Sequence, residues 1–114
     1  MPADELSLFA LWETFLRDLL ARTQKFPKRV RFTLSSRLEN LALDVVERLV
    51  EARYSRQKFG ALQAVSIDIE KLRVLARICH DEGHLDHHGF EHVARSLDEA
   101  GRMVGGWLKQ QAQL

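Results

Sequence analysis

The sequence predicts an all-α protein folded as an antiparallel, up-down-up-down four-helix bundle. Long stretches rich in Leu, Ala, Arg, Glu and Val are interrupted by only two prolines and six glycines in 114 residues, and this composition favours helix. Apolar residues recur three and four positions apart, as on the buried face of an amphipathic helix. The connections are short, which favours antiparallel neighbours. A single domain over residues 1–114 is expected, because 46% hydrophobic content supports one packed core.

The first two helices are separated by the only internal proline. The first is expected from about Asp4 to Gln24, where apolar and aromatic side chains form one broad face. Phe26-Pro27 ends it, because a proline disfavours the helical conformation of the residue before it. The second helix is expected to begin near residues 28–29 and to end near Tyr54-Ser55, before a tight turn or kink. Its predicted inward residues are Leu34, Leu38, Leu41, Val45, Leu49 and Ala52.

The third and fourth helices have the clearest periodicity. The third is predicted to close before Gly83, and a polar loop, His84–His87, leads into the fourth. Steps of three and four in both helices are typical of a coiled-coil seam. The predicted inward residues are Leu62, Val65, Ile69, Leu72, Ala76 and Cys79 in the third helix, and Phe90, Val93, Leu97, Ala100, Val104 and Trp107 in the fourth.

Further apolar residues lie outside these seams. A second apolar face on a helix usually indicates a subunit contact, so we expect a homo-oligomer. The alternative is a wider core stripe, since each helix of a bundle touches two neighbours. The residues concerned are Val46, Val50, Ile67, Val74, Ile78 and Leu108.

Positive charge is concentrated in one part of the chain, although the formal net charge is only +1. No Asp or Glu stands between Arg22 and Arg37, and a second basic group lies near the end of the second helix. Unopposed basic surface attracts a polyanion or an acidic protein surface. The predicted binding residues are Arg22, Lys25, Lys28, Arg29, Arg31 and Arg37, which we call the first basic cluster, and Arg53, Arg56 and Lys58, the second basic cluster.

The two basic clusters are expected at opposite ends of the second helix, about 35 Å apart at about 1.5 Å per residue. They therefore form two patches unless an oligomer brings copies together. The alternative interpretation is an ordinary solvated helix face with local ion pairs, such as Arg48 with Asp44.

Four histidines stand four residues apart around the predicted third loop. On one continuous helix they would share a face suited to a transition metal. Gly83 and Gly89 interrupt that helix, so the sequence predicts no metal site and no other cofactor. The histidines are His80, His84, His88 and His92.

Cysteine content and hydropathy indicate a cytoplasmic protein. Cys79 is the only cysteine, which excludes an intramolecular disulfide framework and fits a reducing compartment. No apolar run approaches the roughly 20 residues that span a bilayer, so no membrane association is expected.

One catalytic alternative rests on Arg73 and His80. Small helical ribonucleases of the HEPN class carry an arginine, then a polar residue, and a histidine a few residues further on. Here six residues separate the pair, but Val74 follows the arginine where the pattern has a polar residue. The sequence shows no Ser/His/Asp order and no glycine-rich phosphate loop, so we predict a non-enzymatic protein without catalytic residues.

The order of motifs resembles a known four-helix-bundle family. Phe26-Pro27-Lys28, Phe32-Thr33-Leu34 and the run Tyr54–Phe59 resemble the intervening-sequence proteins of bacterial 23S ribosomal RNA. The C-terminal run Glu99–Lys109 resembles the ending of the accessory variability determinant of diversity-generating retroelements. The resemblance covers nearly the whole chain.

This resemblance implies a homopentameric barrel of four-helix bundles with a basic surface. It implies binding to RNA, or to an RNA/DNA hybrid, and to the reverse transcriptase of the retroelement. Together these would support mutagenic reverse transcription, with no catalytic role for the accessory protein. An intervening-sequence protein of undefined ribosomal role stays open, because both groups use the same bundle.

Overall fold

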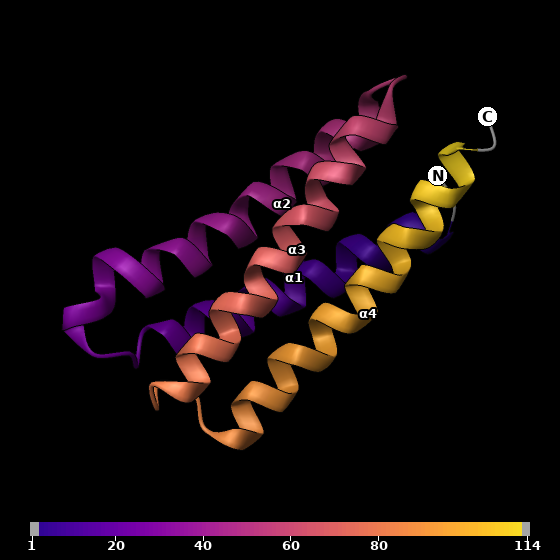
Figure 1. The fold of residues 1–114 in the computed structure, drawn as a ribbon. Helices are drawn as coiled ribbons and strands as arrows, with labels where there is room; N and C mark the ends of the chain where they lie inside the picture. Colours follow the sequence, from indigo (N-terminus) through magenta and orange to yellow (C-terminus); the bar gives the residue numbers. More distant parts are fainter. Residues whose placement is uncertain (1–2, 113–114) are drawn as a thin grey trace.

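Four α-helices make up most of the computed structural model, which describes residues 3–112. They are α1 (Ala3–Thr23), α2 (Ser36–Tyr54), α3 (Lys58–Asp81) and α4 (His87–Ala112). A 3₁₀ turn, η1 (Lys28–Val30), and a π-helical turn, η2 (Arg31–Ser35), join α1 to α2. The chain reverses at every connection, so both ends of the described chain lie at one end of the bundle (Figure 1). The predicted up-down-up-down order is confirmed.

The core runs the length of the bundle, whose Cα extents are 46 × 24 × 19 Å. α1 and α3 lie diagonally opposite, and each packs against both α2 and α4. All six residues of the predicted α3 seam are at most 2% exposed, which confirms that pattern. Steps of three and four keep this seam on one side of the helix, so α3 contributes a continuous strip to the core.

The predicted inward faces of α2 and α4 are partly wrong. Leu34, Leu41 and Phe90 are half-buried rather than buried, while Ala42 is fully buried. In α2 the burial of Ala42 follows from the α1–α2 contact, where the Trp12 indole Nε1–H donates to the Ala42 carbonyl oxygen at 2.9 Å. A small residue on α2 admits this large ring, and the larger leucines lie at the margin of the core.

The α1–α2 connection departs from the predicted simple restart of a helix near residues 28–29. Pro27 is extended, with φ −56° and ψ 144°, and its carbonyl accepts the Val30 N–H at 3.1 Å. The Ser36 N–H then donates to the carbonyl of Arg31, five residues back, which is the π-helical bond. Helical turns begin where predicted, but regular α-helix begins only at Ser36.

The predicted end of the third helix before Gly83 is confirmed. Gly83 has φ +83°, a left-handed conformation that glycine adopts without strain. Its N–H donates to the His80 carbonyl at 3.0 Å, and the His84 N–H donates to the Cys79 carbonyl at 2.8 Å. This pair of bonds is a Schellman motif, which satisfies the last carbonyls of the helix. At the other end of the bundle, a short connection separates Tyr54, the last residue of α2, from Lys58, the first residue of α3, as expected.

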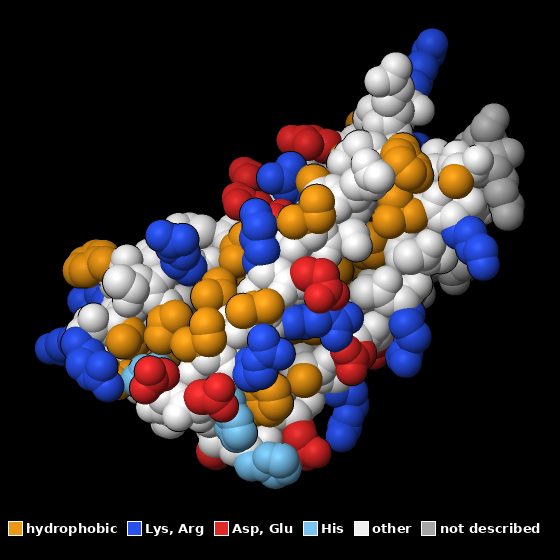
Figure 2. Space-filling model, in the orientation of Figure 1, with side chains coloured by type: hydrophobic (Ala, Val, Ile, Leu, Met, Phe, Trp, Pro, Cys, Tyr) orange, Lys and Arg blue, Asp and Glu red, His pale blue; other side chains and the backbone are white. Residues whose placement is uncertain are grey.

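Most of the apolar residues outside the seams face solvent. Val50, Ile67, Val74 and Ile78 are exposed, and Val46 and Leu108 are half-buried. Hydrophobic side chains gather along α3 on the face shown in Figure 2. The wider-core alternative therefore accounts for only two of the six. No helix in the described part of the chain has the length and hydropathy to cross a membrane.

Two leucines of α2 provide a matched test of the core. Leu49 is 1% exposed and Leu43 is 44% exposed. Leu49→Ala should lower the free energy of unfolding by about 2–5 kcal/mol, because it leaves a cavity, whereas Leu43→Ala should cost about 1 kcal/mol or less. Denaturant unfolding of both variants measures the difference, and equal losses would contradict the placement of the core.

Candidate nucleic-acid interface

The first basic cluster surrounds the α1–α2 connection, where a buried polar contact sets the geometry. The Thr23 Oγ1 hydroxyl is buried and donates to Glu39 Oε2 at 2.6 Å, joining the end of α1 to α2. Phe26, 8% exposed, packs into the same end of the bundle, with its ring centroid 5.5 Å from that of His84. The segment between these anchors is therefore held in place by the bundle and presents its remaining side chains outward.

Five residues of the first basic cluster are exposed: Lys25, Lys28, Arg29, Arg31 and Arg37. Among the residues that the structure describes, none of the five lies within 4.0 Å of a carboxylate oxygen. Their charge is thus not neutralised locally. Figure 2 shows Lys and Arg side chains gathered at this end of the bundle.

Arg22, the sixth predicted member, has different surroundings from the five exposed cations. It is half-buried, and its Nε donates to Asp18 Oδ2 at 2.8 Å. A Cβ atom on Gly89 would lie 2.6 Å from Arg22 Nη1, so a glycine in α4 is what lets the arginine approach. The Asp18 carboxylate is also 3.6 Å from His92 Nε2. Arg22 therefore belongs to the α1–α4 contact.

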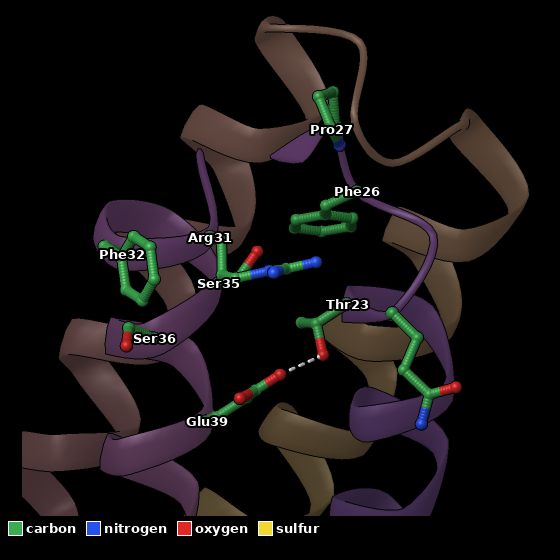
Figure 3. Close-up of a pocket in the computed structure, with 9 residues that line it drawn as sticks. Thr23, Phe26, Pro27, Arg31, Phe32, Ser35, Ser36 and Glu39 are labelled. Carbon is green, nitrogen blue, oxygen red and sulfur yellow. Dashed lines mark hydrogen bonds between the residues drawn. The ribbon is translucent and has the colours of Figure 1, made fainter. Parts of the chain in front are cut away.

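A pocket of about 310 Å³ opens beside η1 and η2, whose cations Lys28, Arg29 and Arg31 we call the basic turn. Thr23 and Glu39 form its floor, and the Arg31 side chain reaches across between the Phe26 ring and this pair (Figure 3). Ser36 and Phe32 lie on the α2 side of the same pocket (Figure 3). Glu39 contributes the only carboxylate among the lining residues.

The second basic cluster lies at the far end of α2, as predicted, and its members have different surroundings. Arg53 and Arg56 are exposed, and the Arg53 guanidinium lies 5.4 Å from the Tyr54 ring centroid. Lys58 is half-buried, with Nζ 5.7 Å from the Trp107 ring centroid and 3.4 Å from the Arg53 carbonyl. Arg53 and Arg56 are accessible to a partner, whereas Lys58 packs against Trp107 of α4 at the end of the bundle.

The α3–α4 connection lies at the same end of the bundle as the first basic cluster (Figure 1), which sequence reasoning missed. It exposes Asp81, Glu82 and Asp86. The histidines pack separately: the His80 ring stacks on Phe90 with centroids 4.6 Å apart, and His84 contacts Phe26. The described residues contain no group of three His, Cys, Asp or Glu side chains placed to hold a metal ion.

The arginine of the ribonuclease alternative is held by α3–α4 contacts. Arg73 pairs with Asp98 on α4 and lies 2.9 Å from Glu70 Oε1. His80 stands two helical turns away, about 10 Å along α3 at about 1.5 Å per residue. Because carboxylates already neutralise Arg73, this pair is poorly suited to phosphodiester cleavage.

The single cysteine is also poorly suited to chemistry. Cys79 is fully buried in the α3 seam, and this burial raises the pKa of its thiol to about 11. The thiol is therefore neutral near pH 7, and the nucleophilic thiolate is absent. Cys79 acts as a small core residue.

The fold and the unpaired cations together define a class: a four-helix bundle with exposed basic side chains around the connection between α1 and α2. A family model, described as bAvd-like, matches residues 9–111. The chain belongs to this bAvd-like family, that of the bacterial accessory variability determinant of diversity-generating retroelements. Proteins of this family are generally non-catalytic accessory proteins. No match was found among curated proteins or among solved structures.

The Thr23–Glu39 hydrogen bond can be tested by removing the hydroxyl alone. Thr23→Val keeps the shape of the side chain but leaves the carboxylate without its donor, so the free energy of unfolding should fall by about 1–2 kcal/mol. Thr14→Val is the control, because Thr14 is exposed and bonds only the Ala10 carbonyl of its own helix. Thermal unfolding compares the two, and similar small losses would contradict a structural role for the contact.

Proposed function

We propose that this protein is the non-enzymatic accessory scaffold of a diversity-generating retroelement. In this role it binds the retroelement's reverse transcriptase and RNA, or an RNA/DNA hybrid, through its basic surface, and so supports mutagenic reverse transcription. Membership of the bAvd-like family supports the context. The observation that carries the proposal is the group of five exposed cations around η1 and η2 without a carboxylate partner among the described residues.

The charge arrangement suits a polyanion. Three of the five unpaired cations are arginines, whose guanidinium groups contact phosphate in a bidentate manner. One turn offers only a few phosphate contacts, which give weak, salt-sensitive binding. A homo-oligomer would present the turn several times, and linked weak contacts add to a high avidity.

The exposed apolar residues support assembly. Ile67, Val74 and Ile78 lie along the solvent face of α3, and Val50 is exposed on α2. We propose that this surface is buried between copies in a homopentameric barrel. A subunit interface removes such area from water, which contributes about 25 cal/mol per Å².

A second function in the same fold is that of a 23S rRNA intervening-sequence protein. Both candidates are served by a basic bundle, so the site does not distinguish them. Genomic context does: an adjacent reverse transcriptase gene and a template–variable repeat pair support the accessory role, and their absence counts against it.

Charge reversal at the basic turn tests RNA binding. The variant Lys28→Glu/Arg29→Glu/Arg31→Glu should bind single-stranded RNA far more weakly than the wild type. The slope of log K against log salt should also become shallower by about 2, since about 0.7 is lost per phosphate contact. Filter binding across a salt series measures both quantities.

The matched control reverses two arginines and one lysine that are exposed on α4: Arg95→Glu/Arg102→Glu/Lys109→Glu. This control makes the same change in net charge away from the basic turn. If both variants lose RNA affinity equally, the net charge of the protein determines RNA binding, and the basic turn is not the interface.

The pentamer is tested by native mass spectrometry. Wild-type protein should give a pentameric mass, and Ile67→Glu/Val74→Glu should give smaller species, because each substitution places a charge in a buried interface. Gln63→Glu, an exposed change on the same helix, controls for added charge. A wild-type monomer would exclude this assembly.

A further inference from the structure

The two most exposed large hydrophobic side chains both lie within the basic clusters. Among the described residues these are Phe32, 85% exposed in the first cluster, and Tyr54, 77% exposed in the second. Every other exposed large hydrophobic residue is at most 56% exposed. Both rings lie beside exposed cations near the ends of α2, and aromatic rings beside basic side chains are the combination by which proteins bind single-stranded nucleic acid.

The π-helical turn η2 keeps the Phe32 side chain exposed to solvent. Phe32 follows Arg31 in this turn, which is preceded by the buried Val30 and ends at the buried Ser35. Such turns often mark functional sites. The ring stands beside Ser36 on the α2 side of the pocket (Figure 3). The backbone is therefore anchored on both sides of Phe32 while its ring meets solvent.

The pocket next to the ring is polar enough to bind more than an apolar side chain. Glu39 Oε2 accepts the Thr23 hydroxyl, and the other carboxylate oxygen has no hydrogen bond within the described part of the chain. Arg31 and Ser36 supply donors around the same pocket. An aromatic wall combined with an acceptor and several donors matches a planar heterocycle that carries an amino group.

We propose that Phe32 and this pocket hold one unpaired base of a single-stranded RNA. The base stacks on the Phe32 ring and offers its amino group to Glu39, while neighbouring phosphates contact Lys28, Arg29 and Arg31. This inference rests on the proposed function, since it specifies how the same basic surface holds RNA.

Stacking adds to the RNA-binding free energy of the basic turn, which makes only a few phosphate contacts. Each base that stacks on an aromatic ring contributes binding free energy that salt does not screen, in addition to the phosphate contacts. In a duplex the bases are already stacked on one another, so only unpaired nucleotides gain from Phe32. Tyr54 offers a second ring of the same kind near Arg53 and Arg56.

The experiment uses Phe32→Ala, with a short oligocytidylate RNA and an RNA duplex of similar length as probes. Oligocytidylate is single-stranded and carries an amino group on every base. Phe32→Ala should bind it about tenfold more weakly. The slope of log K against log salt should stay the same, because no phosphate contact is lost. Duplex binding should not change.

Two further variants complete the test. Phe32→Trp should retain the affinity, and its added fluorescence should be quenched by the oligonucleotide. Leu43→Ala removes another exposed apolar side chain of α2 and should leave affinity unchanged. Because Phe32 is so exposed, Phe32→Ala should unfold at the wild-type temperature, so an effect on binding would not reflect misfolding.

The outcomes separate this inference from the proposed function. If Phe32→Ala binds oligocytidylate as well as the wild type, while the charge-reversal variant does not bind, the RNA-binding role of the basic turn is supported and base stacking on Phe32 is overturned. If Phe32→Ala loses only the reverse transcriptase, the ring is a protein contact and the base site is overturned. If wild-type protein binds neither RNA probe, the proposed RNA-binding function itself fails.

Discussion

The candidate interface depends on the hydrogen bond between Thr23 and Glu39. Glu39 is the first acidic residue after Arg22 in the sequence. Its carboxylate accepts the buried Thr23 hydroxyl at 2.6 Å instead of pairing with a surface cation. This contact joins α1 to α2, and among the described residues no cation of the first basic cluster lies within 4.0 Å of the Glu39 carboxylate.

The connection above this contact holds a short exposed segment in place between α1 and α2. Phe26 and Val30 are buried, so the chain is fixed at both ends of a short segment. Pro27 holds the extended conformation that separates them. With the backbone fixed, the exposed side chains lose less conformational entropy when they meet a ligand, because part of that cost has been met in folding. A long, flexible basic tail would bind the same phosphates with a larger entropic penalty.

Periodicity in the sequence predicted the bundle because helix geometry leaves little choice. Six apolar residues in steps of three and four can share only one face of α3, and all six are buried. Ala42 was missed because Leu41 and Ala42 both fit steps of three and four between Leu38 and Val45, and only the Trp12 ring from another helix makes Ala42 the buried one. Burial was thus predictable where one helix decides it, and not where a neighbour does.

Ion pairs were hard to predict as well, because the partner of a charged residue can lie on another helix. Arg48 was considered beside Asp44 on its own helix, but it donates to Asp68 on α3 at 3.0 Å. Asp68 is 4% exposed, so a buried carboxylate takes the arginine, and a local pair in water does not compete. Arg22 was counted as unopposed because its partner, Asp18, stands just before the acid-free stretch. The cations of η1 and η2 are exposed and have no carboxylate partner among the described residues, and no acid lies near them in the sequence; their role in binding stays a prediction.

The end of the bundle that carries the basic turn also carries the acidic α3–α4 connection. This end therefore has one basic side and one acidic side. Asp81, Glu82 and Asp86 are exposed there and repel a polyanion. Arg22 stands between the two regions, paired with Asp18 and against Gly89 of α4. If the protein binds RNA as we propose, a strand drawn to Lys28 and Arg29 is steered away from α4 and toward α2. On that side the exposed Phe32 ring and the pocket beside it are the first features it meets.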